Sequence, residues 1–167
     1  MGHAAAPAMS LVENTLMTSH SKDVIDKWGI INFKNISKRT SRIVSEFDVR
    51  TPTLDNTAAS LSGGNLQKFV IGREILEKPK VFVVNQPTWG VDAAAAAFIR
   101  QSILNLASQK SAVIVISQDL DELFEICDTF AVLTNGYMSR IYELGHLSSE
   151  DVGLLMGGSD LDLDSHA

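Results

Sequence analysis

The stretch Ser62-Gly63-Gly64-Asn65 stands where an amphipathic helix is predicted to begin. Serine is a favoured N-cap, and paired glycines let neighbouring backbone N–H groups turn outward together. The predicted helix continues with apolar residues at helical spacing, namely Leu66, Phe69, Val70 and Leu76. Because a helix N-terminus has free donors and the positive end of the helix dipole, we expect an anion site here. Taken by itself, a stretch of this kind is more often simply a capped helix after a loop.

Amide side chains follow two apolar strands that are predicted further along the chain. Strand 80–84 runs into Asn85 and Gln86, and strand 112–116 is followed by Gln118. Asn85 is neutral, and neither glutamine can accept a proton, although a carboxamide oxygen can orient a water molecule. Strand 80–84 is a continuous β-branched and aromatic run, so we expect a parallel strand that is buried on both faces.

The elements around these residues predict an α/β core that follows a small helical subdomain. Ser10 and Glu13 form a capping-box start, 37–47 has helical spacing, and Asp92 is the predicted N-cap of a helix over 93–106. After a short helix over 119–127, Asn135-Gly136 predicts a hairpin between strands 129–134 and 137–142, and Ser148 begins a last helix. We expect a signature subdomain over 1–79, an α/β half over 80–158 and an acidic tail over 159–167, with the first nine residues disordered.

Composition narrows the classes of function. The chain has 167 residues, a formal charge of −6 and 45% hydrophobic residues, which fits a globular domain and argues against a nucleic-acid surface. The single cysteine, Cys127, excludes an internal disulfide and is expected to be a small core residue. Four scattered histidines give no metal-ligand spacing, so no metal site is predicted. No apolar run approaches the length of a membrane span.

Three blocks agree in sequence and in spacing with a known family. The family is that of ATP-binding cassette (ABC) transporter domains. Its signature motif resembles Leu61 to Lys68, its Walker B and D-loop segment resembles Asn85 to Asp92, and its switch segment resembles Ser117 to Leu120. The resemblance covers roughly residues 10–158. It implies a partial P-loop NTPase core of the ABC type, with parallel strands and a C-terminal β-hairpin.

The resemblance also implies roles for single residues. Ser62, Gly63, Gly64 and Asn65 would contact the γ-phosphate of an ATP molecule held by the opposite domain. Asn85 stands where the family places an aspartate of the Mg²⁺ shell, Gln86 where it places the catalytic glutamate, and Gln118 where it places the switch histidine. These three positions are therefore degenerate. Asp92 matches the D-loop, and it is an N-cap, a contact across a dimer, or both.

The exact form of the motifs resembles the second nucleotide-binding domain of duplicated ATPase subunits from bacterial simple-sugar and nucleoside importers. The implied partners are the N-terminal cassette of the same subunit, a second ATPase subunit and the transmembrane permease subunits. The implied location is cytoplasmic, on the inner face of the plasma membrane through the permease. ATP and Mg²⁺ belong to the parent assembly, and no cofactor is expected for the isolated chain.

No G-x-x-x-x-G-K-[S/T] phosphate loop occurs in the sequence. In the family that loop lies N-terminal to everything seen here. We therefore expect this chain to be a native or engineered piece of a domain, and we expect the isolated chain to be inactive. The favoured reading is an importer ATPase fragment that supplies its signature motif in trans. The alternative is a non-catalytic interaction or regulatory module that keeps the fold. A stand-alone hydrolase is disfavoured because Asn85 and Gln86 are not bases.

Overall fold

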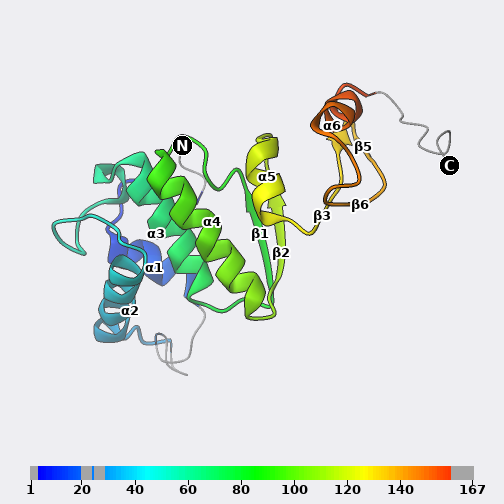
Figure 1. Ribbon diagram of the computed structural model, residues 1–167. Helices are drawn as coiled ribbons and strands as arrows, with labels where there is room; N and C mark the ends of the chain where they lie inside the picture. The colour runs from blue at the N-terminus through cyan, green and yellow to red at the C-terminus, as the bar shows by residue number, and fades with distance from the viewer. Residues whose placement is uncertain (1–3, 20–23, 25–28, 159–167) are drawn as a thin grey trace. The chain divides into compact units, whose positions relative to one another are not determined.

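The computed structural model describes residues 4–19, 24 and 29–158 (Figure 1). The chain divides into two compact units, Met1–Ile116 and Ser117–Ala167, and each is described by itself. The observed boundary differs from the one expected near residue 79, because β1 (Val81–Asn85) shares a core with the helix that precedes it. The predicted acidic tail, 159–167, lies outside the described residues.

Two short helices open the first unit. α1 spans Leu11–Thr18 and has the predicted capping box, since Ser10 Oγ accepts from the Glu13 N–H and the Glu13 carboxylate accepts from the Ser10 N–H at 2.7 Å. α2 spans Phe33–Glu46 and begins one turn before the predicted position. The reason is the Asn32 side chain, which accepts from the Asn35 N–H at 3.1 Å and caps the helix there.

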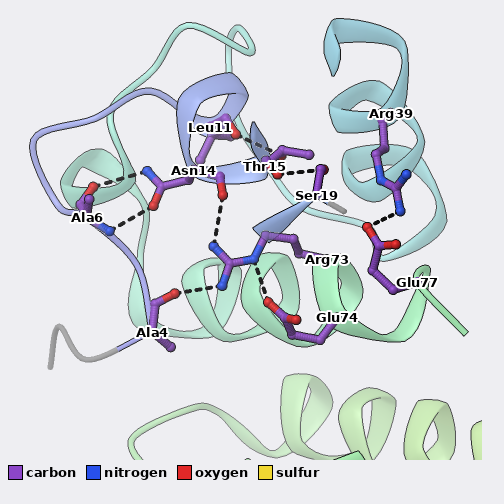
Figure 2. A network of polar contacts seen from close by, with 10 residues as sticks. All are labelled: Ala4, Ala6, Leu11, Asn14, Thr15, Ser19, Arg39, Arg73, Glu74 and Glu77. Atoms are coloured by element: carbon purple, nitrogen blue, oxygen red, sulfur yellow. Dashed lines mark hydrogen bonds and ion pairs between the residues drawn. The ribbon is translucent and has the colours of Figure 1, made fainter. Parts of the chain in front are cut away.

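Residues 4–9, which we expected to lack structure, are tied to the helices by hydrogen bonds (Figure 2). The buried Asn14 side chain bonds both the N–H and the carbonyl oxygen of Ala6, at 2.8 and 3.1 Å. Arg73 donates to the carbonyl oxygens of Ala4 and Asn14, at 2.8 and 3.1 Å, and pairs with Glu74. A buried guanidinium thus holds the start of the chain and α1 against the next helix.

The third helix, α3, spans Gly63–Ile75, with the predicted Ser62 as its N-cap, and it follows the short 3-10 helix η1 (Ala58–Ser60). Phe69 and Val70 are buried as predicted and pack with Leu11, Ile43 and Phe47. Leu66 and Leu76 are only partly buried at the margin of this cluster. Gly72 lies directly against Phe47, since a Cβ there would be 2.5 Å from the Phe47 ring. The first helices therefore form one core around α3.

Helix α4 spans Ala93–Ser108 and packs beside α3 and against a parallel pair of strands, β1 and β2 (Ala112–Ile116) (Figure 1). Strand β2 has the predicted bounds. Phe82 of β1 packs with Ile71 of α3 and with Ile99, Ile103 and Leu106 of α4. This second cluster fixes the C-terminal end of β1, where Asn85 stands, relative to the two helices.

The expectation that β1 is buried on both faces is wrong. Its residues alternate, with Phe82 buried and Val81 and Val83 exposed. A continuous apolar run predicts burial only where layers cover both faces of a sheet. In the first unit, α3 and α4 cover one face of the pair, and within the described residues β1 and β2 pair only with each other.

The second unit begins with α5 (Leu120–Ile126), whose N-cap is Asp119, and ends with α6 (Ser149–Met156), which has a capping box of Ser148 and Asp151. Between them the predicted hairpin is present but interrupted. The pairs β3 (Thr129–Phe130) with β6 (Tyr142–Glu143) and β4 (Leu133–Thr134) with β5 (Tyr137–Met138) are antiparallel. Asn135 and Gly136 both have positive φ, as the predicted turn requires.

The break in the hairpin has a local cause. The hydroxyl of Ser139 accepts from the Val132 N–H at 2.9 Å, so a side chain replaces one rung of the ladder. Val132 and Tyr142 then pack with Val152 and Leu155 of α6 to form the small core of this unit. Cys127 is half-buried, and burial raises the pKa of its thiol.

Candidate functional site

A small hydrogen-bond group lies at the N-terminus of α3. The hydroxyl oxygen of Ser62 accepts from the side-chain Nδ2 of Asn65 at 2.9 Å and from its backbone N–H at 3.5 Å. The Oδ1 atom of Asn65 accepts from the backbone N–H of Arg50 at 2.9 Å. Because the Arg50 N–H can only donate, the amide oxygen of Asn65 must face Arg50 and its NH₂ group must face Ser62.

This group orients the exposed Ser62 hydroxyl. Its oxygen accepts from Nδ2 of Asn65 at 2.9 Å, so its own proton is available to another acceptor. Gly63 and Gly64 are the first two residues of α3, and the N–H groups of a first turn have no partner within their own helix. The end of α3 therefore presents donors and the positive end of a dipole.

The start of α4 lies beside this end of α3. A Cβ at Gly64 would be 3.4 Å from the Cβ of Ala95 and 3.6 Å from Oδ2 of Asp92. Asp92 is the N-cap of α4, and its Oδ1 accepts from the Ala95 N–H at 2.9 Å. The structure thus brings the predicted signature residues and Asp92 together, and a Cβ at Gly64 would make ordinary contacts with the start of α4.

The two amides after β1 lie at the end of the strand. Asn85 is its last residue and is exposed. Gln86 has a positive φ of 52°, with its N–H donating to the Ile116 carbonyl oxygen at 2.8 Å and its own carbonyl oxygen accepting from Trp89 at 3.2 Å. A non-glycine residue in this conformation is strained, and such residues recur at functional sites. Sequence patterns carry no signal for this backbone conformation.

The end of β1 is a poor fit for a magnesium ion. Mg²⁺ is bound in proteins through carboxylates, whereas Asn85 and Gln86 offer neutral amides. In the described part of the chain, no three His, Cys, Asp or Glu side chains gather where they could hold a metal.

Gln118 belongs to the second unit, Ser117–Ala167. It is exposed and precedes α5. Beside it, the Ser117 hydroxyl donates to the buried Glu122 carboxylate at 2.8 Å and accepts from the Asp119 N–H at 3.1 Å. These bonds fix the backbone around Gln118. Sequence reasoning missed both Glu122 and Arg50 as parts of the two groups, because bonds across several residues or to a backbone N–H leave no pattern.

No protein-family model matches the sequence, but individual relatives do. The chain is 36% identical over 141 residues to the galactose/methyl galactoside import ATP-binding protein of Mannheimia succiniciproducens, covering 84% of this chain and 28% of that protein. It is 33% identical over 153 residues to the nucleoside import ATP-binding protein of Lactococcus lactis, covering 92% of this chain and 30% of that protein. The chain therefore spans less than a third of these relatives.

Solved structures show the same fold. A dimeric ATP-binding cassette in a post-hydrolysis state, bound to ADP and phosphate, superposes with a TM-score of 0.68 at 18% identity, over 86% of this chain and 60% of that one. A metal-chelate type ABC transporter in an inward-facing conformation gives a TM-score of 0.71 at 17% identity, over 90% of this chain and 59% of that one. Among the described residues, no helix is both long enough and apolar enough to cross a membrane.

Proposed function

Since this chain is part of an ABC-type ATP-binding subunit, similar to those of sugar and nucleoside importers, we propose that it contacts ATP held by a partner cassette. In this proposal the N-terminus of α3 is the contact, and Ser62, Gly63, Gly64 and Asn65 carry it. The partner is the N-terminal cassette of the same subunit, with a second ATPase subunit and a permease completing a sugar or nucleoside importer at the cytoplasmic face of a membrane.

The observation that carries the proposal is the orientation of the Ser62 hydroxyl. Its oxygen accepts from the side-chain N–H of Asn65 at 2.9 Å, so its own proton remains for another acceptor, in the same region as the free amides of the first turn. A γ-phosphate offers only acceptor oxygens and negative charge, which suits the donors at a helix N-terminus. Asn65 acts here as a positioning residue, because its own bonds run to Ser62 and Arg50.

The second half of the proposal is that the chain's own catalytic positions are weak. Asn85 lacks the charge of an Mg²⁺ ligand, and Gln86 and Gln118 cannot act as general bases. Gln86 can still hold a water molecule through its amide oxygen. The chain would therefore support hydrolysis at the partner's site more than at its own.

The test is phosphate release by the parent subunit with Ser62→Ala, compared with Ser148→Ala. Each substitution removes a serine N-cap, at a cost of about 0.5–2 kcal/mol in stability, so the pair separates lost capping from lost chemistry. We expect Ser62→Ala to lower ATP turnover at least about tenfold, the effect of a lost hydrogen bond to a charged group, and Ser148→Ala to leave it unchanged. Unchanged turnover with Ser62→Ala would favour the non-catalytic interaction module instead.

A further inference from the structure

Basic side chains follow one stripe of α2 in an order that does not favour the helix. Lys34, Lys38 and Arg42 are four residues apart, so they lie above one another on the helix surface. An exposed helix face is stabilised by opposite charges at this spacing and destabilised by like charges. Lys34 also lies in the first turn and Glu46 at the last residue, where the helix dipole favours the opposite signs. Stability of the helix therefore does not explain this arrangement of charges.

The basic stripe borders a cavity of about 290 Å³. The cavity is lined by four side chains of α2 and by the C-cap residue of α3, namely Asn35, Lys38, Arg39, Arg42 and Leu76. No carboxylate is among these lining residues. One of the cations is fixed in place, because Arg39 pairs with Glu77 and both side chains are largely buried (Figure 2). The cavity thus has a positive wall of which one part is already ordered.

Lys38 is the cation in this wall whose charge is not offset. Arg42 pairs with Glu46 at 2.8 Å and Arg39 pairs with Glu77, whereas Lys38 forms no ion pair with a described residue. A guanidinium group has five N–H donors, so an arginine that is paired with one carboxylate can still donate to a second anion. A phosphate group, with several acceptor oxygens and up to two negative charges, suits an ammonium group beside guanidinium groups.

A second cavity, of about 380 Å³, adjoins the first, since Arg42 and Leu76 line both. Its α4 wall carries side chains that form hydrogen bonds, namely Gln101, Ser102, Asn105 and Gln109. The rings of Phe47 and Phe98 also line it. Amide and hydroxyl groups beside aromatic rings suit a body that carries hydroxyl groups, because a hydroxyl both donates and accepts.

We propose that the two cavities form one binding site for a small organic phosphate whose body carries hydroxyl groups, the class that includes the sugar phosphates. The phosphate lies in the first cavity against Lys38, and the body lies in the second. Each cavity has the size of a small-ligand site, which disfavours a macromolecular partner. Leu76 and Ser62 are at opposite ends of α3, so this site is separate from the proposed ATP contact and does not depend on it.

The experiment titrates the 167-residue chain with glucose 6-phosphate in a calorimeter. The ionic strength is about 0.15 M, at which charges farther apart than about 8 Å are largely screened. Glucose and inorganic phosphate are the comparison ligands, and we expect each to bind at least about tenfold more weakly because each occupies only one cavity. Lys38→Gln should weaken binding of glucose 6-phosphate at least about tenfold, since it removes a charge-assisted hydrogen bond. The matched control is Lys80→Gln, an exposed lysine that lines neither cavity, which should bind normally.

Loss of binding can be told apart from loss of folding. Lys38→Gln removes a charge that lies between two like charges, so its urea midpoint should equal or exceed that of the unmodified chain. Arg42→Gln is the second variant and should also weaken binding, because Arg42 lines both cavities.

Three results would overturn the proposal: no binding of glucose 6-phosphate by the folded chain, equal binding by the Lys38→Gln and Lys80→Gln variants, or equally tight binding of glucose or of inorganic phosphate. A last arm uses phosphatidylglycerol vesicles as the probe. Binding to the vesicles that requires Lys38 and is tighter than binding to glucose 6-phosphate would assign the site to a lipid headgroup, and the proposal of a free ligand would be wrong.

Discussion

The substitution Gly64→Asp tests the crowded junction between α3 and α4. A Cβ at residue 64 would lie 3.4 Å from the Ala95 Cβ, an ordinary contact, so the fold has room for the first side-chain atom. The same Cβ would lie 3.6 Å from Oδ2 of Asp92, so the new carboxylate comes close to an existing one. Two like charges about 4 Å apart in water repel by about 1 kcal/mol, a modest loss of stability because Asp92 is exposed.

The functional effect should be much larger than the structural one. In the parent transporter the new carboxylate would stand where a γ-phosphate is proposed, in a gap with less water, and ATP-driven uptake should be abolished. Gly64→Asn is the matched control, because it has nearly the same size and no charge, and it should retain measurable uptake. The assay is radiolabelled-substrate uptake alongside urea denaturation of each variant. Normal uptake by Gly64→Asp, or equal loss by both variants, would refute the reasoning from charge.

Two further predictions concern stability. Gly72→Ala should destabilise the chain by about 1–2 kcal/mol in urea denaturation, because the added Cβ meets the buried Phe47 ring at 2.5 Å and this overpacking outweighs the gain in helix propensity. Gly153→Ala adds a Cβ with nothing within 4 Å and should stabilise the chain by about 0.5–1 kcal/mol. Equal effects of the two substitutions would contradict the packing of Gly72 against Phe47. The pKa of Glu13 is lowered, chiefly by the hydrogen bond from the Ser10 N–H, so its contribution to stability is present above the unfolded-state pKa and is lost as the pH falls through the lower folded-state pKa. The urea midpoint should fall between pH 5 and pH 3, by less in Glu13→Gln than in the unmodified chain, and an equal fall in both would count against the capping box.

Local signals predicted the helix starts well, because caps are short-range chemistry. Ser10, Ser62, Asp92 and Ser148 each cap the helix that their sequence context indicates. The start of α2 was predicted four residues too late, at 37 instead of Phe33. The N-cap Asn32 was not recognised in the sequence. Cap chemistry therefore fixed most helix boundaries without any knowledge of tertiary packing.

Features that depend on distant parts of the chain were harder to predict. The exposure of Val81 and Val83 depends on which layers are present, and the apolar run 81–84 is the same whether one face or two are covered. The bond from Arg50 to Asn65 joins residues fifteen apart through a backbone N–H, which every residue but proline has. For the candidate site, the residue types could be read from the sequence, but the orientation of Ser62 and the strained backbone of Gln86 required the structure.

The most direct test of the account concerns Gln86, because the central claim is that this chain assists a partner's site. Alanine at a positive φ is strained to a similar degree, so Gln86→Ala removes the side-chain amide without changing the strain in the backbone. The measurement is phosphate release by the parent transporter at saturating ATP. The account predicts a change of less than about twofold, whereas loss of a true general base costs about 10²–10⁴-fold. If Gln86→Ala alone stops turnover, the end of β1 is catalytic and the account of this chain as the assisting half is wrong.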